Sequence, residues 1–216
     1  SSDVRSSDLV LGERLPTVPG VRGFLSYFVL IGAGYILVEV GLIQRFVLFL
    51  GHPTYALTCV IFSMLLASGI GSAMQKRLVG LSSARLVRVL VVVAVLIAVL
   101  AVALTPLLTS LVGLPLALKV AVTIALIAPS GFVMGMPFPS GLRLLDEWHA
   151  PSVRWAWALN AASSVLGSVG ALVCAIYMGL TQTLLLGALL YVIALVLISR
   201  NTVRFVSQRG RQSPTG

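Results

Sequence analysis

Residues 86–111 read LVRVLVVVAVLIAVLAVALTPLLTSL, and this segment alone determines the class of structure. It carries one charged residue, Arg88, and exceeds the roughly 20 apolar residues that a helix needs to cross a hydrocarbon core of about 30 Å. Lipid offers the backbone no hydrogen-bond partners, so a lipid-exposed segment of this kind is a helix. A transmembrane β-barrel would need alternating apolar and polar residues, which are absent. The segment therefore predicts an all-α membrane protein.

Further segments meet or approach the same length, and the composition of the whole chain agrees with them. Of the 216 residues, 58% are hydrophobic and 10% are charged, whereas soluble domains carry about 25% charged residues. The additional predicted helices cover residues 24–48, 54–75, 115–137, 154–178 and 182–199. We expect a cytoplasmic linker at 1–22, a six-helix transmembrane domain at 23–200 and a basic cytoplasmic tail at 201–216.

The basic residues are distributed unequally between the connecting segments. Thirteen of the fifteen Lys and Arg residues fall before the first predicted span, after the second, after the fourth and in the tail. Only Arg45 and Lys119 fall on the other side. The positive-inside rule therefore predicts that both termini are cytoplasmic. The net charge of +9 does not indicate nucleic-acid binding, because long apolar runs separate the cations and prevent one basic face.

Residues that would carry catalysis or bind a metal are sparse. Cys59 and Cys174 each lie within an apolar run, and His52 and His149 are predicted on opposite sides of the membrane. No phosphate-binding loop, nucleophile elbow or zinc-protease motif occurs. We therefore expect no catalytic centre, metal or cofactor. The chain starts at Ser1, without Met or a signal peptide, and we expect it to be a piece of a longer product.

Small residues recur at four-residue spacing in the second, fourth and fifth predicted spans. Membrane helices associate through such residues because they let two backbones approach closely. The residues concerned are Ser68, Gly69, Ser72, Gly131, Gly135, Ser163, Gly167 and Ala171. We expect these three spans to form the tightly packed interior of the bundle. A substrate pathway lined by the same small residues is the alternative.

Glu39 is the only acidic residue inside a predicted span. A carboxylate at the bilayer centre costs at least about 2.5 kcal/mol, so it must be paired, protonated or facing a polar cavity. Tyr35 lies one turn before it, and Gln44 and Arg45 follow within two turns, which gives the first span a polar stripe. Either Glu39 forms a buried ion pair, with Arg45 or an arginine of another helix, or it is a proton or cation site. Arg45 could also extend to the interface, and Asn160 is expected to bond between helices.

Three prolines, Pro129, Pro137 and Pro139, lie at the end of the fourth span. Proline removes a backbone donor, so we expect the helix to kink or end near the cytoplasmic face. Two outcomes are open. The break could expose backbone groups to a ligand, as broken helices do in transporters, or an ordinary helix end could lead into a short amphipathic segment.

Three segments together resemble a known family. They are GYILVEVGLIQRFVLFLGHPTYALT (34–58), MGMPFPSGLRLL (134–145) and WAWALNAASSVLGSV (155–169). They are similar to the membrane region of bacterial membrane-fused spermidine synthase-like proteins, which join an aminopropyltransferase-type domain to membrane helices. The resemblance covers roughly residues 24–200. The positions that match the family pattern are Glu39, Gln44, Arg45, His52, Pro53, Met136, Pro137, Pro139 and Asn160.

The chain departs from that family in its lack of a catalytic domain. A glycine-rich nucleotide turn and acidic residues for a polycationic amine are both missing, so polyamine synthesis by this chain alone is not expected. The resemblance implies a multi-pass protein of the bacterial inner membrane with a soluble domain upstream of residue 1. We expect a non-catalytic anchor or scaffold, partnered by that domain or by other subunits.

Two other functions remain open. A bundle that resembles half of a transporter could move a cation or a polyamine through Glu39. An enzyme that acts on a lipid or quinone, with His149 or Glu39 as its base, would need an orienting partner that the sequence does not offer. A histidine could also bind pigment or haem in a larger assembly.

Overall fold

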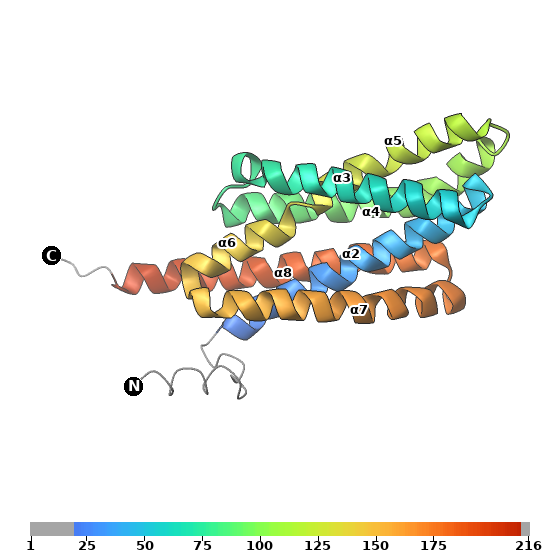
Figure 1. Ribbon diagram of the computed structural model, residues 1–216. Helices are drawn as coiled ribbons and strands as arrows, with labels where there is room; N and C mark the ends of the chain where they lie inside the picture. The colour runs from blue at the N-terminus through green and yellow to red at the C-terminus, as the bar shows by residue number, and fades with distance from the viewer. Residues whose placement is uncertain (1–19, 213–216) are drawn as a thin grey trace, which may run out of the picture.

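The computed structural model describes residues 20–212, with side chains for residues 20–200, and every element in this range is helical (Figure 1). The elements are α2 (Val21–Leu50), α3 (Pro53–Leu78), α4 (Ser83–Ser110), α5 (Leu116–Met134), α6 (Pro137–His149), the 3-10 turn η1 (Ala150–Ser152), α7 (Val153–Tyr177) and α8 (Leu180–Gln212). The predicted all-α class is confirmed. Most helix ends lie within three residues of their predicted positions.

Five helical segments are long and apolar enough to cross a membrane. The fourth of them, Leu116–Tyr177, comprises α5, α6, η1 and α7. The chain reverses direction within this segment, because α5 and α6 run toward the end of the bundle from which α7 returns (Figure 1). Large apolar side chains cover the outside, such as Leu166 and Ile176, which are 74% and 77% exposed. Such a surface fits lipid and not water.

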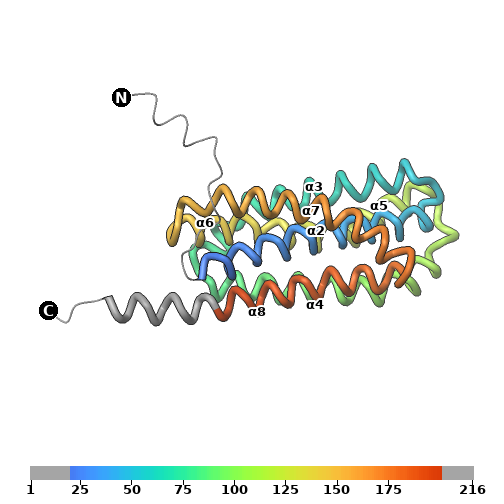
Figure 2. Tube along the Cα trace, turned by 90° about the horizontal axis from the view of Figure 1, so that it is seen from below, coloured from blue at the N-terminus to red at the C-terminus, as the bar shows by residue number. Residues whose placement is uncertain are grey.

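Helix α2 occupies the centre of the bundle (Figures 1 and 2). It packs most extensively on α7 and α8, and it also contacts α3, α5 and α6, while α4 packs on α8 and α3 on α5. Half of its membrane-spanning window is buried, a larger share than in any other spanning segment. The expectation that the second, fourth and fifth spans form the interior is therefore wrong. α7 and α8 pack most extensively on α2, α3 packs on it less, and α5 contacts it only slightly.

Tight turns join successive helices and fix their antiparallel arrangement. Gly51 ends α2 with a positive φ of 77°, and its amide donates to the Val47 carbonyl at 3.0 Å. A residue with a side chain is strained in this left-handed conformation. His52 then caps α3 by accepting a hydrogen bond from the Thr54 amide at Nδ1, and Pro53 takes the first helical position, which suits proline because no amide is needed there.

The fourth predicted span breaks at Gly135 and Met136. The amide of Gly135 donates to the Gly131 carbonyl and that of Met136 to the Val133 carbonyl, which closes α5 before Pro137 starts α6. No backbone amide in the described chain donates to the Gly135 carbonyl, because the residue four positions later is Pro139. The expected break is therefore present at Pro137, and Pro139 lies in the first turn of α6.

Pro129 departs from the prediction, since it lies inside α5 and the helix continues past it. Membrane helices tolerate proline where neighbouring helices satisfy or cover the freed carbonyl. The segment after the break is the short amphipathic helix α6. Its buried residues Pro137, Ser140, Gly141 and Leu145 recur at helical spacing and form one face.

The structure describes little of the predicted linker at 1–22 but most of the backbone of the predicted tail at 201–216. Residues 1–19 of the predicted linker lie outside the described residues, and Val21 already belongs to α2. The backbone of α8 continues to Gln212, so most of the predicted 201–216 tail extends the last helix. A helix boundary at residue 200 was expected because hydrophobicity ends there, but helical backbone does not require an apolar sequence.

Candidate functional site

A cavity of about 110 Å³ lies beside the α5–α6 break. Five helices line it, and its wall combines aromatic rings with polar groups: Ile31, Gly32, Tyr35, Met134, Pro137, Phe138, Asn160, Ser164 and Tyr191. Its volume is far below the roughly 300–1,000 Å³ of pockets that enclose drug-sized ligands. It therefore fits a small head group or a few water molecules. The structure brings Tyr35, Asn160 and Pro137 together here, although they are far apart in sequence.

Asn160 ties α7 to α2. Its Nδ2 donates to the backbone carbonyl of Phe28 at 3.0 Å, which is the interhelical bond expected of this residue. Gly32 makes the contact possible, because a Cβ at that position would lie 2.6 Å from Asn160 Nδ2 and from Ser163 Oγ. The hydroxyls of Ser163 and Ser164 both donate to the Asn160 carbonyl at 2.9 Å. The side-chain NH2 group of Asn160 therefore points toward α2.

Two tyrosines supply the phenol groups of the cavity. Tyr35 donates its hydroxyl to Ser68 Oγ of α3 at 3.4 Å. Tyr191 of α8 is only 1% exposed, and its hydroxyl forms no hydrogen bond with the rest of the described chain. A third phenol, that of Tyr27, donates a hydrogen bond to the Pro137 carbonyl at the helix break, at 2.8 Å. The backbone of the broken helix is therefore held by α2.

Glu39 is half-buried on α2 and lies one turn from Tyr35 on the same face. No hydrogen bond or ion pair joins it to another side chain in the described range, so neither the ion pair considered with Arg45 nor one with another arginine is formed there. The carboxyl does not itself line the cavity. Side chains four residues apart on a helix have Cβ atoms about 5–6 Å apart, so Glu39 and Tyr35 are neighbours on α2.

Arg45 serves a different part of the bundle. Its two terminal nitrogens donate to Thr105 Oγ1 of α4 and, at 2.7 Å, to Thr181 Oγ1 of α8. Nε is buried without a partner. Arg45 therefore turns inward and joins three helices. Gln44 is half-buried and does not line the cavity, so the predicted polar stripe of α2 separates into two groups.

The small residues of α3 and α5 bring two backbones together. A Cβ on Gly71 would clash with the Phe132 carbonyl, and one on Gly135 with the Ser68 carbonyl. Gly131 faces Ala67 and Met64. Gly69 has nothing within 4 Å of such a Cβ, so its predicted packing role is wrong, because it lies on the exposed face of α3. Ser72 is half-buried.

In α7 the small residues face α2 and not α3 or α5. Gly167 is buried against Ala33 and Ile36 of α2. Ser163 and Ala171, one turn to either side, are buried with it. The spacing identified the contact face of α7, but the sequence could not name the helix on the other side.

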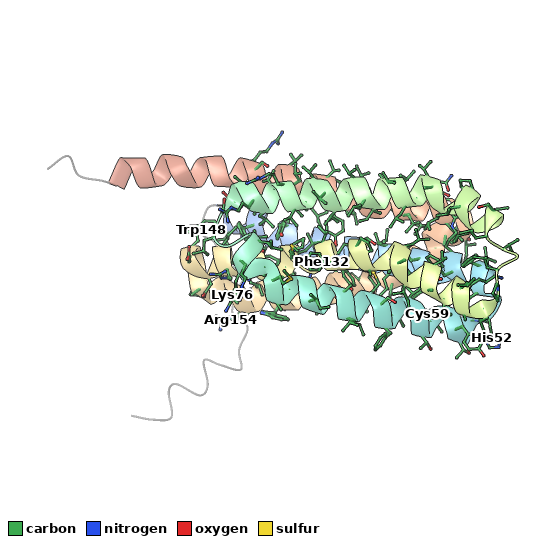
Figure 3. The ribbon with its side chains drawn as sticks, turned by 90° about the horizontal axis from the view of Figure 1, so that it is seen from above. His52, Cys59, Lys76, Phe132, Trp148 and Arg154 are labelled. Atoms are coloured by element: carbon green, nitrogen blue, oxygen red, sulfur yellow. The ribbon has the colours of Figure 1, made fainter. Side chains whose placement is uncertain are left out.

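Metal ligands do not converge in the described part of the chain, where no group of three or more His, Cys, Asp or Glu side chains could hold an ion. Figure 3 places His52 and Cys59 near one end of the bundle and Lys76, Trp148 and Arg154 at the other. His149 Nδ1 lies 2.7 Å from Ser152 Oγ, which connects it to the turn before α7.

The comparisons with known proteins give no relative. No protein-family model, curated protein or solved structure matches this chain. The family resemblance of the three segments therefore remains a prediction from the sequence.

Sequence reasoning missed several residues of the cavity and its surroundings. Tyr191, Ser164 and Phe138 line it, and Tyr27 holds the break. Tyr191 could have been identified from the sequence, because it is a single phenol in an otherwise apolar span. Gln75, which accepts from Ser140 Oγ at 3.2 Å, was hidden because it lies at a helix end where polar residues are common.

Proposed function

We propose that the chain is a non-catalytic integral membrane module, an anchor or scaffold that crosses the membrane six times. One observation carries this proposal: three polar side chains of the interior, those of Tyr27, Arg45 and Asn160, bond to other helices. Tyr27 and Asn160 bond to backbone carbonyls, and Arg45 bonds to two threonines. Bonds of this kind hold membrane helices together, so the interior polarity serves assembly of the bundle.

Six crossings and cytoplasmic termini are supported by the path of the chain and its charge. α5 and α7 run in opposite directions, and α2 begins at the end of the bundle toward which α8 runs (Figures 1 and 2). Lys76 and Arg154 lie at that same end (Figure 3). The positive-inside rule assigns the cation-rich end to the cytoplasm.

The partner we propose is a soluble domain or another subunit on the cytoplasmic side. The resemblance to spermidine synthase-like membrane regions supports this choice, and it also supports the bacterial inner membrane as the location. The basic loops offer a cationic surface that would attract an acidic partner surface.

Gentle detergent extraction from the native membrane, followed by mass spectrometry of the intact particle, tests the module. We expect this chain to travel with another subunit or with a soluble domain in a longer product. A particle that contains only copies of this chain would contradict the anchor proposal.

Transport of a cation or polyamine is a second candidate. It is favoured by the carboxyl of Glu39, which has no ion-pair partner among the described residues and lies one turn from a residue that lines a cavity at a helix break. Its test is uptake of labelled amines and monovalent cations into vesicles. Transport predicts that Glu39→Gln abolishes uptake, whereas unchanged uptake in that variant would contradict a role for Glu39.

A further inference from the structure

The hydrogen bonds already made around the cavity decide which ligand chemistry it accepts. Tyr35 gives its hydroxyl hydrogen to Ser68, and Ser164 gives its own to the Asn160 carbonyl. Asn160 turns Nδ2 toward Phe28 and Gly32. Each of these groups has thus used one donor within the protein, and their oxygen lone pairs remain available; Asn160 keeps a second amide hydrogen. The cavity wall is rich in acceptors.

Aromatic rings add a second feature that favours cations. Tyr35, Phe138 and Tyr191 come from three helices and line the same small space. The face of an aromatic ring attracts an ammonium group within about 6 Å of its centroid. None of the lining residues is Lys or Arg, so no resident cation occupies that position, and Arg45 is bonded elsewhere to Thr105 and Thr181.

The carboxyl group of Glu39 lies one turn from Tyr35 on the same helix and can supply a negative charge. The described chain gives this carboxyl no ion-pair partner, and an uncompensated charge in a membrane interior is costly. A cation bound beside Tyr35 would balance it. We propose that the cavity at the α5–α6 break binds the primary ammonium head group of a small alkylamine, with Glu39 as the counter-charge.

A primary ammonium fits better than a neutral head group. It offers three donors and no acceptor, which complements a wall of acceptors, whereas an alcohol offers one donor. The volume of about 110 Å³ limits the bound part to the head group and a short chain. The binding rests neither on the anchoring role nor on transport.

Binding of radiolabelled n-propylamine to the full chain in lipid nanodiscs tests the proposal, with empty nanodiscs subtracted to remove partition into lipid. We expect saturable binding that unlabelled n-propylamine displaces and that 1-propanol at equal concentration does not. Absence of saturable binding, or equal displacement by the alcohol, would overturn the proposal.

Two variants locate the site without removing a bond within the protein. Glu39→Gln should weaken binding by at least about tenfold, because it removes the counter-charge in a medium of low polarity. Tyr191→Phe should weaken it about tenfold, the range for one hydrogen bond to a charged group. The matched control is Tyr177→Phe, since Tyr177 is 84% exposed and outside the cavity. Unchanged affinity in both test variants would overturn the site. Failure here leaves the mass-spectrometric test of the anchor unaffected.

Discussion

Glycine has different consequences at two helix contacts of this bundle. Between α3 and α5, Gly71 and Gly135 each face a backbone carbonyl of the other helix, and the space is fully occupied. Between α2 and α7, Gly32 faces the side chains of Asn160 and Ser163 together with the Asn160 backbone carbonyl, and it borders the cavity. The first contact is close packing, whereas the second makes room for polar groups. A small-residue pattern alone does not distinguish these two uses.

The largest effect is expected at the α3–α5 contact. Gly135→Ala places a Cβ against the Ser68 carbonyl, which belongs to the backbone and cannot move without moving the helix. We expect a loss of stability at the upper end of the roughly 1–3 kcal/mol that overpacking costs. Thermal unfolding in detergent measures it. Stability equal to that of the unchanged chain would show that the two helices do not touch at this position.

A smaller loss of stability is expected at the α2–α7 contact. In Gly32→Ala the new Cβ meets Asn160 Nδ2 and Ser163 Oγ at 2.6 Å and the Asn160 backbone carbonyl oxygen at 2.8 Å. This backbone approach is less close than the one at Gly135, and side-chain ends yield more easily than backbone. We expect a cost of about 1 kcal/mol together with weaker n-propylamine binding, because Asn160 is displaced. If this variant lost more stability than Gly135→Ala, the distinction between the two contacts would be wrong.

A milder substitution tests the hydrogen bond by which α2 stabilises the α5–α6 break. Tyr27→Phe removes the hydroxyl that donates to the buried Pro137 carbonyl and keeps the ring in place. The expected loss is about 1 kcal/mol, the net value of one hydrogen bond. A proteolysis or thermal assay beside Tyr177→Phe as the control detects it. Equal stability of the two variants would contradict the role of Tyr27.

The smallest effect is expected at Gly69. It lies between Ser68 and the packed Gly71 on the same helix, yet its Cβ position is open. Gly69→Ala should change the free energy of unfolding by less than about 0.5 kcal/mol, as surface substitutions do. A loss comparable to that of Gly135→Ala would place a further helix or subunit against this face of α3.

The sequence predicted the helices well and their neighbours poorly. Apolar length identifies a membrane helix, so the element ranges followed directly from residues such as those of 86–111. The sequence does not show in the same way which face of a helix is buried. Lipid is as apolar as the protein interior, so apolar residues are found on both the lipid-facing and the inward-facing sides. The first span was therefore predicted only to carry a polar stripe, whereas α2 is the centre of the bundle, although Gly32, Gly34 and Gly41 were visible in it.

The candidate site was predicted in part for a related reason. Tyr35, Asn160 and Pro137 stood out because polar groups and proline are rare in membrane helices. Phe138 and Ser164 did not, since neither differs from ordinary span residues. Grouping Glu39 with Arg45 was an inference from proximity along the chain, and a separation of six residues on a helix turns the two side chains about 120° apart, to different faces.

The central claim is that the module crosses the membrane six times. It is tested most directly by finding on which side of the membrane each turn between helices lies. Single cysteines would be introduced at Ser82, Gly113, Ala150 and Gly179 after replacement of Cys59 and Cys174, and labelled from each side of sealed membranes with an impermeant maleimide. The account predicts cytoplasmic labelling at Ser82 and Ala150 and external labelling at Gly113 and Gly179. External labelling at Ala150, or cytoplasmic labelling at Gly179, would contradict it, because α5 and α7 would then not be separate crossings.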